Sequence, residues 1–320
     1  MLIRNVCLLL ICLTSLFADE EETHQEGFFG ANPIPWFTGP LLATSARTVR
    51  PGHFKIQPYF NAFVTVGHYD RHWHSHSVDN FYDVNLRIQT KIGIASRLDI
   101  QFLPRVVYRE TRGSHCLNIG DMPIGLNIQI FRPEKLGDHP SLKLGLRANV
   151  PSGQYQHLKA SKFRTDVTGS GCWFPGGGLY FSHIWYLRDV HYLELRISTE
   201  YRIGVPVRLR GLNAYGGTAN TRATGYPGNY FRLDAAVEYS FTQRWSFACD
   251  AVFFQFNRDR FKGSDKADLE KVSREEFSLA PAIEYSWSRD LGIIGGVWFS
   301  IAGRNIPQFV NGMLSVNAYF

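Results

Sequence analysis

The stretch Phe309-Val-Asn-Gly-Met-Leu-Ser-Val-Asn-Ala-Tyr-Phe320 ends the chain and decides its fold. Val310, Leu314, Val316, Ala318 and Phe320 share one parity, and polar Asn311, Ser315 and Asn317 share the other. This period of two predicts a strand with one apolar and one polar face. A terminal strand has an unpaired edge unless another strand closes against it.

A final strand ending in Phe320 resembles the assembly signal of bacterial outer-membrane β-barrels, although Ala318 replaces the bulky residue usual there.

The N-terminus indicates the same compartment. Arg4 precedes the apolar run Val6–Phe17, and Ala18 offers a small residue for cleavage. Residues 1–18 are therefore predicted to be a signal peptide. No later apolar run is long enough for a membrane helix. We expect localisation in the outer membrane of a Gram-negative cell.

Composition fits one large barrel. The 320 residues contain 14% aromatic residues and 29 glycines, as girdles and turns require. The net charge is +6; without residues 1–26, 33 basic and 23 acidic residues remain, about +10. A basic body attracts anions, and no nucleic-acid motif accompanies it, so nucleic acid is not an expected partner.

Alternation recurs along residues 53–320, the predicted barrel domain. It predicts an all-β fold: an antiparallel, up-and-down transmembrane barrel of about 12 strands, even in number. Connections after even-numbered strands are mostly tight. Connections after odd-numbered strands are mostly long and polar, at 67–77, 110–120, 152–175, 208–228 and 257–275. Short turns are periplasmic in such barrels.

Residues 19–52 lack alternation but contain the apolar, proline-rich stretch 33–42. This N-terminal segment is predicted to be either a strap packed under the barrel or a plug entering the lumen.

Inward parity predicts the lumen-lining charges. The first five strands contribute a net basic wall, and strands seven to ten a net acidic wall. These candidates are Lys55, Asp83, Arg87, Lys91, Asp99, Arg105, Arg109, Lys143, Arg147, Glu194, Arg196, Glu200, Arg202, Arg232, Asp234, Glu238, Asp250, Glu276 and Glu284. Such walls orient a dipolar solute, or else the charges pair and block flow.

Several short motifs carry a family resemblance. They are the run Pro35–Ser45, Pro51-Gly52-His53, Ile56-Gln57-Pro58-Tyr59, Gly120-Asp121 and Asn149-Val-Pro-Ser-Gly153. Together they resemble the outer-membrane transporter family named for the MetA pathway of phenol degradation. The resemblance implies a barrel that moves small molecules and supplies no catalytic residues.

Histidines crowd one predicted loop, at His68, His72, His74 and His76. Imidazoles spaced i, i+2 are weak candidates for Zn²⁺ or Cu²⁺ ligands, against a solvated polar loop. Cys116 and Cys172 fall in predicted loops on one side of the membrane and either form a disulfide or stay free. No cofactor is expected.

The sequence thus predicts a monomeric, non-enzymatic channel that passes small solutes passively across the outer membrane. Its expected partners are outer-membrane lipid, the barrel-assembly machinery and the solute. The alternative is a surface-binding barrel, such as an adhesin, receptor or metal-binding loop protein, without transport. An outer-membrane lipase is disfavoured, since Ser75 lies in a loop without that family's motif.

Overall fold

The computed structural model describes residues 35–133, 137–265, 269 and 272–320. The predicted signal peptide and residues 19–34 lie outside this part of the chain. Among the described residues, no helix combines the length and apolar character that a membrane-spanning helix needs.

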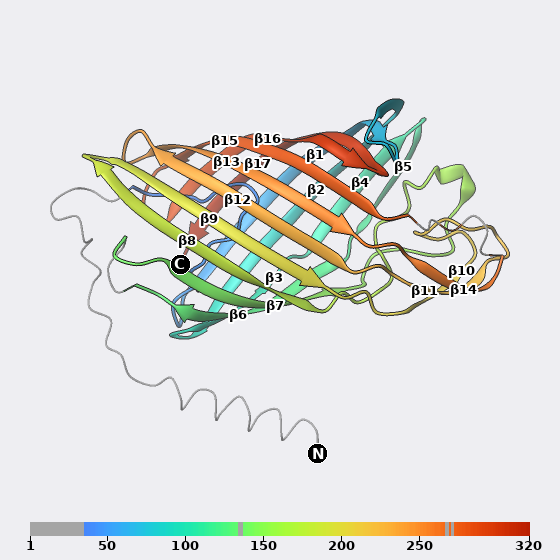
Figure 1. Ribbon diagram of the computed structural model, residues 1–320, viewed down its shortest axis with the longest axis horizontal. Coiled ribbons are helices and arrows are strands. Elements are labelled where there is room, and N and C mark those ends of the chain that lie inside the picture. The colour runs from blue at the N-terminus through green and yellow to red at the C-terminus, as the bar shows by residue number, and fades with distance from the viewer. Residues whose placement is uncertain (1–34, 134–136, 266–268, 270–271) are drawn as a thin grey trace, which may run out of the picture.

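The described residues form a closed antiparallel barrel (Figure 1). Its strands are β1 (Phe54–Tyr69), β2 (Ser75–Ala95), β3 (Leu98–Phe102), β4 (Arg105–Thr111), β5 (Ser114–Ile119), β6 (Met122–Phe131), β7 (Ser141–Val150), β8 (Gly176–Arg188), β9 (His191–Arg202), β12 (Tyr230–Ser240), β13 (Trp245–Phe256), β15 (Arg274–Ser286), β16 (Leu291–Arg304) and β17 (Ile306–Tyr319).

Two barrel strands are interrupted. β2 pairs with both β3 and β4, which continue one another across Leu103-Pro104, and β5 continues into β6 across Gly120-Asp121. Proline cannot donate a ladder hydrogen bond, which accounts for the first break. Counted this way, the described chain has twelve barrel strands, so the predicted fold class is confirmed.

The ring closes where β17 pairs with β1. Asn311, which is fully buried, donates to Asn61 at 3.3 Å, and Asn61 donates to Asn85 at 3.2 Å. These inward amides extend the pairing of β17, β1 and β2 across the closing seam. The terminal strand therefore has its polar parity inside, as its alternation predicts.

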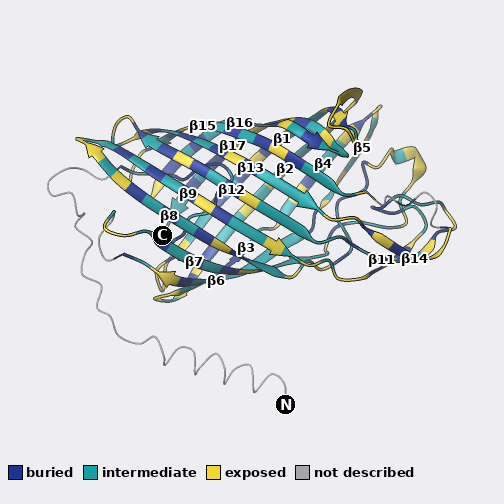
Figure 2. Cartoon of the chain, viewed as in Figure 1, coloured by how far each residue is buried: buried dark blue, intermediate teal, exposed yellow. Residues whose placement is uncertain are grey.

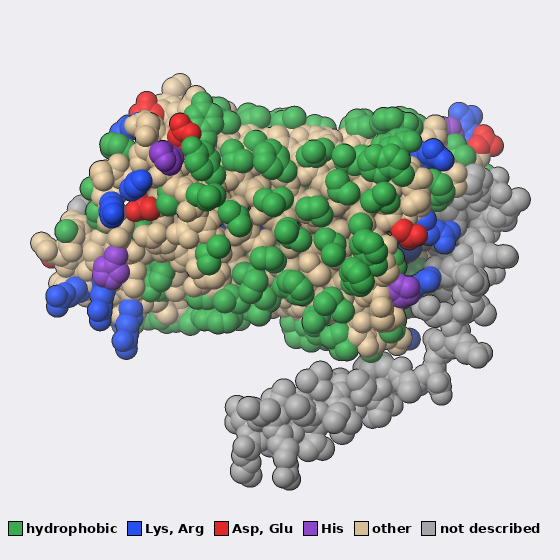
Figure 3. All heavy atoms as spheres, turned by 180° about the vertical axis from the view of Figure 1, so that it is seen from behind, with side chains coloured by type: hydrophobic (Ala, Val, Ile, Leu, Met, Phe, Trp, Pro, Cys, Tyr) green, Lys and Arg blue, Asp and Glu red, His purple; other side chains and the backbone are tan. Residues whose placement is uncertain are grey.

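The outer surface is an apolar band. Phe60, Leu146 and Leu314 expose 46–47% of their surface, and Figure 3 shows hydrophobic side chains covering the barrel wall between two ends where charged groups gather. In Figure 2 buried and exposed residues alternate along the strands. Lipid can solvate such a band, and barrel closure satisfies the backbone groups that lipid cannot.

Two predicted long loops are wrong. Residues 67–77 and 110–120 are mostly strand, because β1 and β2 reach a turn at 70–74, and β4 and β5 meet at Arg112-Gly113. Above the membrane both faces of a hairpin meet water, so the apolar alternation ends while backbone pairing continues.

The long connections carry a second, smaller sheet. It consists of β10 (Val207–Arg210), β11 (Arg222–Tyr226) and β14 (Arg260–Ser264), which join the β9–β12 and β13–β15 connections at the long-loop end (Figure 1). A short 3₁₀ helix (Ala160–Lys162) lies in the β7–β8 connection. We call this three-stranded sheet the cap. Its short strands lie almost entirely within the predicted loops 208–228 and 257–275.

Candidate functional site

The N-terminal segment enters the lumen from the short-turn end. Its Trp36 N–H donates to the Gln243 carbonyl at 3.1 Å, in the turn between β12 and β13. Farther along, the Gly52 N–H donates to the Gly93 carbonyl at 3.2 Å, near the β2–β3 turn. Both ends of the described segment therefore lie at the same rim. The part between them contacts inward-facing side chains of the barrel wall.

The first half of the segment is held by the acidic wall. The Thr38 N–H donates to Glu284 Oε2, and the Ala43 N–H donates to Asp250 Oδ1, each at 2.8 Å. Leu41, 2% exposed, packs in a cluster with the inward Ala248 on β13 and Ala282 on β15. Small inward residues leave room for this side chain, so the contact combines charge-assisted hydrogen bonds with apolar burial.

The second half is held by the opposite wall. The Val49 N–H donates to Asp99 Oδ2 and the Thr48 N–H to Gln129 Oε1, both at 2.8 Å, while Lys143 Nζ donates to the Ser45 carbonyl at 2.5 Å. β3, β6 and β7, which carry these side chains, lie across the ring from β13 and β15. The segment therefore crosses the lumen.

Glycines allow the segment to approach the wall closely. A Cβ on Gly93 would overlap the Arg50 carbonyl group, and a Cβ on Gly292 would overlap Thr38 Oγ1. Within the segment, Gly39 has a φ of +100°, which L side chains rarely adopt. Sequence reading missed these positions because glycine in a strand is also typical of a bend.

A cavity of about 570 Å³ lies beside the segment. It is lined by residues 38–45 and by inward side chains of the barrel. A second cavity of about 390 Å³ adjoins it toward the long-loop end and shares Arg87, Arg105, Asn149, Phe174 and Phe256 with it. Together they form an internal space, lined by both charged and aromatic side chains, that begins at the segment and reaches the β7–β8 connection.

The structure places the predicted lumen charges inside the barrel. The first cavity is lined by Lys55, Arg87, Lys91, Arg105, Arg147, Arg196, Glu200, Arg202, Arg232 and Glu276, and the second also by Arg109. The remainder face inward as buried groups or ion-pair partners: Asp83, Asp99, Lys143, Glu194, Asp234, Glu238, Asp250 and Glu284.

Most charge pairs form within one wall. Arg109 Nε lies 2.7 Å from Asp83 Oδ2, and Arg232 Nε lies 2.7 Å from Asp234 Oδ1, each pair lying close together on the sheet. Arg196 contacts both Glu194 and Glu238, at 3.0 and 3.1 Å. The two walls meet in an ion pair at Arg147 and Glu200, whose atoms lie 3.8 Å apart.

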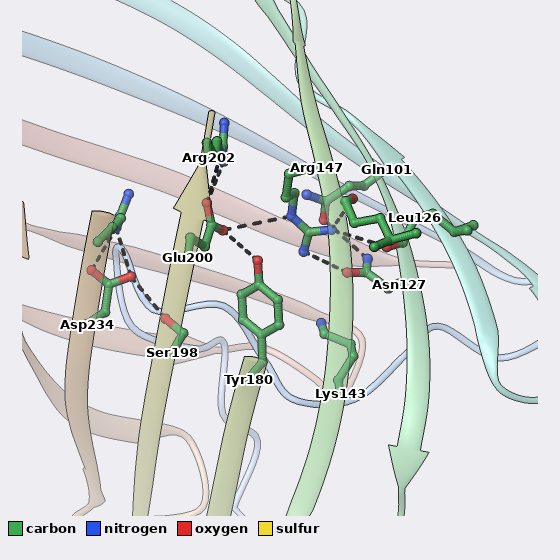
Figure 4. Close-up of polar contacts among 12 residues, drawn as sticks. Gln101, Leu126, Asn127, Lys143, Arg147, Tyr180, Ser198, Glu200, Arg202 and Asp234 are labelled. Atoms are coloured by element: carbon green, nitrogen blue, oxygen red, sulfur yellow. Dashed lines mark hydrogen bonds and ion pairs between the residues drawn. The ribbon is translucent and has the colours of Figure 1, made fainter. Parts of the chain in front are cut away.

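Glu200 on β9 links several strands (Figure 4). It accepts the Tyr180 hydroxyl at 2.5 Å and pairs with Arg202 at 2.5 Å and with Arg147 Nε at 3.8 Å. Arg147 also donates to Asn127 Oδ1 at 2.7 Å. This network joins β6, β7, β8 and β9.

Aromatic side chains also line the lumen, and the sequence reading did not identify them. Phe254 and Phe256 on β13 share the inward parity of Asp250 and line the first cavity, as do Tyr230 and Trp298. Their parity relative to Asp250 was the available signal. It was obscured because aromatic residues are also expected on the lipid face near the membrane surface.

The histidine-rich turn is organised around Asp70. His76 Nε2 lies 3.1 Å from Asp70 Oδ2, and the backbone N–H groups of His72 and His74 donate to Asp70 Oδ1 at 2.7 and 3.0 Å. The hydrogen bond with His76, foremost, holds the pKa of the Asp70 carboxyl well below its usual range. In the described part of the chain no cluster of three such side chains has metal-binding geometry. Ser75 Oγ donates to Gln308, outside any catalytic arrangement.

The three cysteines of the described chain are free, so the possible bridge between Cys116 and Cys172 is not formed. Cys172 is 2% exposed and packs beneath the cap with Leu209, Phe261 and Tyr215. Its Sγ lies 3.4 Å from the Tyr215 hydroxyl. Burial raises the pKa of the Cys172 thiol.

Comparison with solved structures supports the same architecture. The chain is similar to the COG4313 outer membrane channel from Pseudomonas putida F1, with a TM-score of 0.65 and 13% identity over 86% of this chain and 98% of that one. It also matches the NanC porin (TM-score 0.40, 11% identity, 82% and 98% covered) and the KdgM porin (0.39, 10%, 82% and 99%). No known family profile matches the chain, and no curated protein matches it.

Closure, the apolar outer band and the short-turn/long-loop asymmetry are all present in one ring. Only helices and closed barrels satisfy every backbone group within lipid. The chain is an outer-membrane β-barrel whose lumen holds an N-terminal segment and a charged, aromatic-lined cavity.

Proposed function

We propose that the barrel is a passive channel for small solutes across the outer membrane. The observation that supports this most strongly is the pair of adjoining cavities, which extend from the N-terminal segment to the long-loop end. Eight strands leave an interior that side chains fill, and sixteen leave an open channel. Twelve strands leave space for a small solute, and the segment takes part of that space.

The segment would act as the gate of this channel. It is anchored mainly through backbone groups to carboxylates and one lysine, not through an extended apolar core. Each such hydrogen bond contributes about 1.5–3 kcal/mol, so a few must break together for the segment to leave. Passage would need no ATP, cofactor or catalytic residue.

Conductance tests the proposal directly. The refolded chain starting at residue 19 is compared in planar bilayers and swelling liposomes with a chain starting at residue 53. We expect small single-channel conductance steps for the longer chain. For the shorter chain we expect larger conductance steps that stay open. A correctly folded shorter barrel that passes neither ions nor small sugars would refute the channel.

The apolar outer band also supports the remaining expectations. On the face shown in Figure 3, hydrophobic side chains cover much of the barrel wall, as a lipid-facing monomer requires. The proposal includes recognition of Phe320 by the barrel-assembly machinery. It also includes membership of the transporter family named for the MetA pathway of phenol degradation.

A second candidate function is surface binding, which the cap favours. One face of its sheet is entirely basic or neutral and exposed, with Arg208, Arg210, Arg222, Arg260 and Lys262, while Val207, Leu209 and Phe261 face inward. Such a face would bind an anionic polymer at the cell surface. Salt-sensitive retention of the purified barrel on immobilised heparin, lost when Arg210 and Arg222 become Gln, would support it; retention unchanged by these substitutions would exclude it.

A further inference from the structure

Two arginines meet where the cavities join. Arg87 on β2 and Arg105 on β4 are directly opposite each other in the strand register, and both line both cavities. Like charges directly opposite each other destabilise a sheet. The pair therefore costs stability that some other interaction must offset.

Carboxylates lie near this pair but do not contact it. In the described part of the chain neither arginine forms an ion pair, and the buried Nε of each lacks a hydrogen-bond partner. The guanidinium of Arg87 lies over the Tyr59 ring at 5.0 Å, and Arg105 Nη2 reaches the Thr168 carbonyl at 3.4 Å. By contrast, Arg109, four residues farther along β4, forms an ion pair with Asp83.

Asp121, an acid that lines the second cavity, is hydrogen-bonded to other groups. Asp121 accepts the Gly153 N–H at 3.0 Å, the Ser170 N–H and hydroxyl at 2.8 Å, and the Asn149 amide at 3.1 Å. Its carboxylate oxygens are thereby used to hold the β7–β8 connection. The two guanidiniums thus line both cavities without a carboxylate in contact.

The far side of the same cavity is aromatic and fixed. Phe254 and Phe256 are covered by the guanidiniums of Arg232 and Arg274, at 5.1 and 5.0 Å. Trp298 donates to Ser278 Oγ at 2.8 Å and meets Phe63 edge to face at 5.4 Å between ring centres. β13 lies across the ring from β4, whereas β16 lies three strands from β2. The wall opposite Arg105 thus presents aromatic rings among charged side chains such as Arg232 and Glu276.

We infer that the lumen binds a small organic oxyanion, a carboxylate or phosphate carried on an apolar ring. Arg87 and Arg105 receive the oxyanion, since a guanidinium fork matches its oxygens in two parallel hydrogen bonds. The aromatic side receives the ring. The cavity of about 570 Å³ lies within the range of small-molecule sites. This inference rests on the proposed channel and names its substrate class.

Calorimetry on the refolded full mature barrel tests it, with benzoate, phenyl phosphate and neutral benzyl alcohol as probes. Arg87→Gln with Arg105→Gln is compared with Arg112→Gln with Arg304→Gln, which removes the same charge from arginines that have carboxylate partners and line neither cavity. We expect the first pair to weaken binding of the anions at least tenfold and the second at most about twofold. Tighter binding of benzoate or of phenyl phosphate identifies the carboxylate or the phosphate as the preferred group.

Three results would overturn the inference: no binding of either anion to wild type, equal affinity for benzyl alcohol and benzoate, or wild-type affinity in Arg87→Gln/Arg105→Gln. Arg87→Lys with Arg105→Lys keeps the charge and should retain part of the affinity, which separates loss of binding from misfolding. Chloride conductance is recorded on the same samples. A barrel that binds benzoate but conducts nothing would refute the proposed channel and support the binding site. A barrel that conducts but binds neither anion would refute the binding site and support the channel.

Discussion

At the scale of single residues, Phe320 closes the ring. Its ring stacks on Phe54 with centroids 4.8 Å apart, and its N–H and C=O bond the Phe54 backbone at 2.8 and 2.9 Å. Deleting Phe320 removes both contacts and should lower the yield of heat-modifiable barrel in the outer membrane several-fold. Phe320→Ala keeps the backbone hydrogen bonds but loses the ring, and Phe320→Trp keeps both an aromatic ring and the backbone hydrogen bonds. Comparing the two variants separates the contribution of ring stacking from that of the backbone hydrogen bonds. Wild-type levels after the deletion would contradict an assembly role.

A substitution at Gly93 tests the close approach of the N-terminal segment to the barrel wall. Gly93→Ala places a methyl group against the Arg50 carbonyl, which must move because the strand cannot. We expect a folded barrel with larger single-channel conductance than wild type. Gly312→Ala is the control, since a Cβ there meets nothing within 4 Å. Equal conductance of both variants and wild type would show that the segment tolerates the displacement.

Parity made the residues of the lumen partly predictable. A one-residue slip would put Arg87 or Lys143 into lipid, at roughly 2–4 kcal/mol each near the midplane, so inward charge positions follow from alternation. Alternation does not show which of these arginines lies beside a carboxylate. Arg109 and Arg105 are four residues apart on the same parity, yet only Arg109 lies beside Asp83. That difference depends on the strand register and on the loop that engages Asp121.

At the scale of elements, the segment is held through Asp250 and Glu284. Asp250→Asn with Glu284→Gln weakens two charge-assisted bonds, to the N–H groups of Ala43 and Thr38. About 1–3 kcal/mol of anchoring should be lost per bond, so open events in single-channel records should become more frequent. Glu276→Gln is the matched control, because Glu276 lines the same cavity but forms no hydrogen bond with described segment residues. The same increase in that control would show that lumen charge alone is responsible.

The cap is a second element whose integrity can be measured. Because the Cys172 thiol is buried and its pKa is raised, its neutral form stabilises the folded cap. That contribution is complete below the thiol's ordinary pKa and is lost as pH rises toward the folded value. Maleimide should therefore label Cys172 slowly at pH 7 and much faster at pH 9–10, with Cys172→Ser as the blank. Rapid labelling at pH 7 would show that the cap does not cover this residue.

Elements within the membrane were predictable, and those beyond it less so. Lipid on one side and a polar lumen on the other impose alternation, which located every strand of the ring. The cap strands, such as β10, have only four or five residues, and their alternation resembles that of a polar loop. The crossing of residues 38–49 carries no periodicity at all, since backbone groups make most of its contacts.

At the scale of the whole molecule, the barrel has one orientation. Long connections and the cap lie at one end, and short turns and the C-terminus at the other (Figure 1). A peptide tag inserted between Arg112 and Gly113, in the exposed β4–β5 turn, should be detected by antibody on intact cells. The same tag between Asp189 and Val190, in the β8–β9 turn, should need permeabilised cells. Surface detection of the second tag would reverse the assigned orientation.

The segment enters and leaves the lumen at one rim, next to Gln243 and next to Gly93. It can therefore withdraw as a loop, without drawing a free chain end through the ring. After withdrawal it remains tethered to β1 through residues 51–53, so its effective concentration at the lumen stays fixed by a short linker. Reclosure is then a first-order event whose rate does not depend on the amount of protein in the membrane.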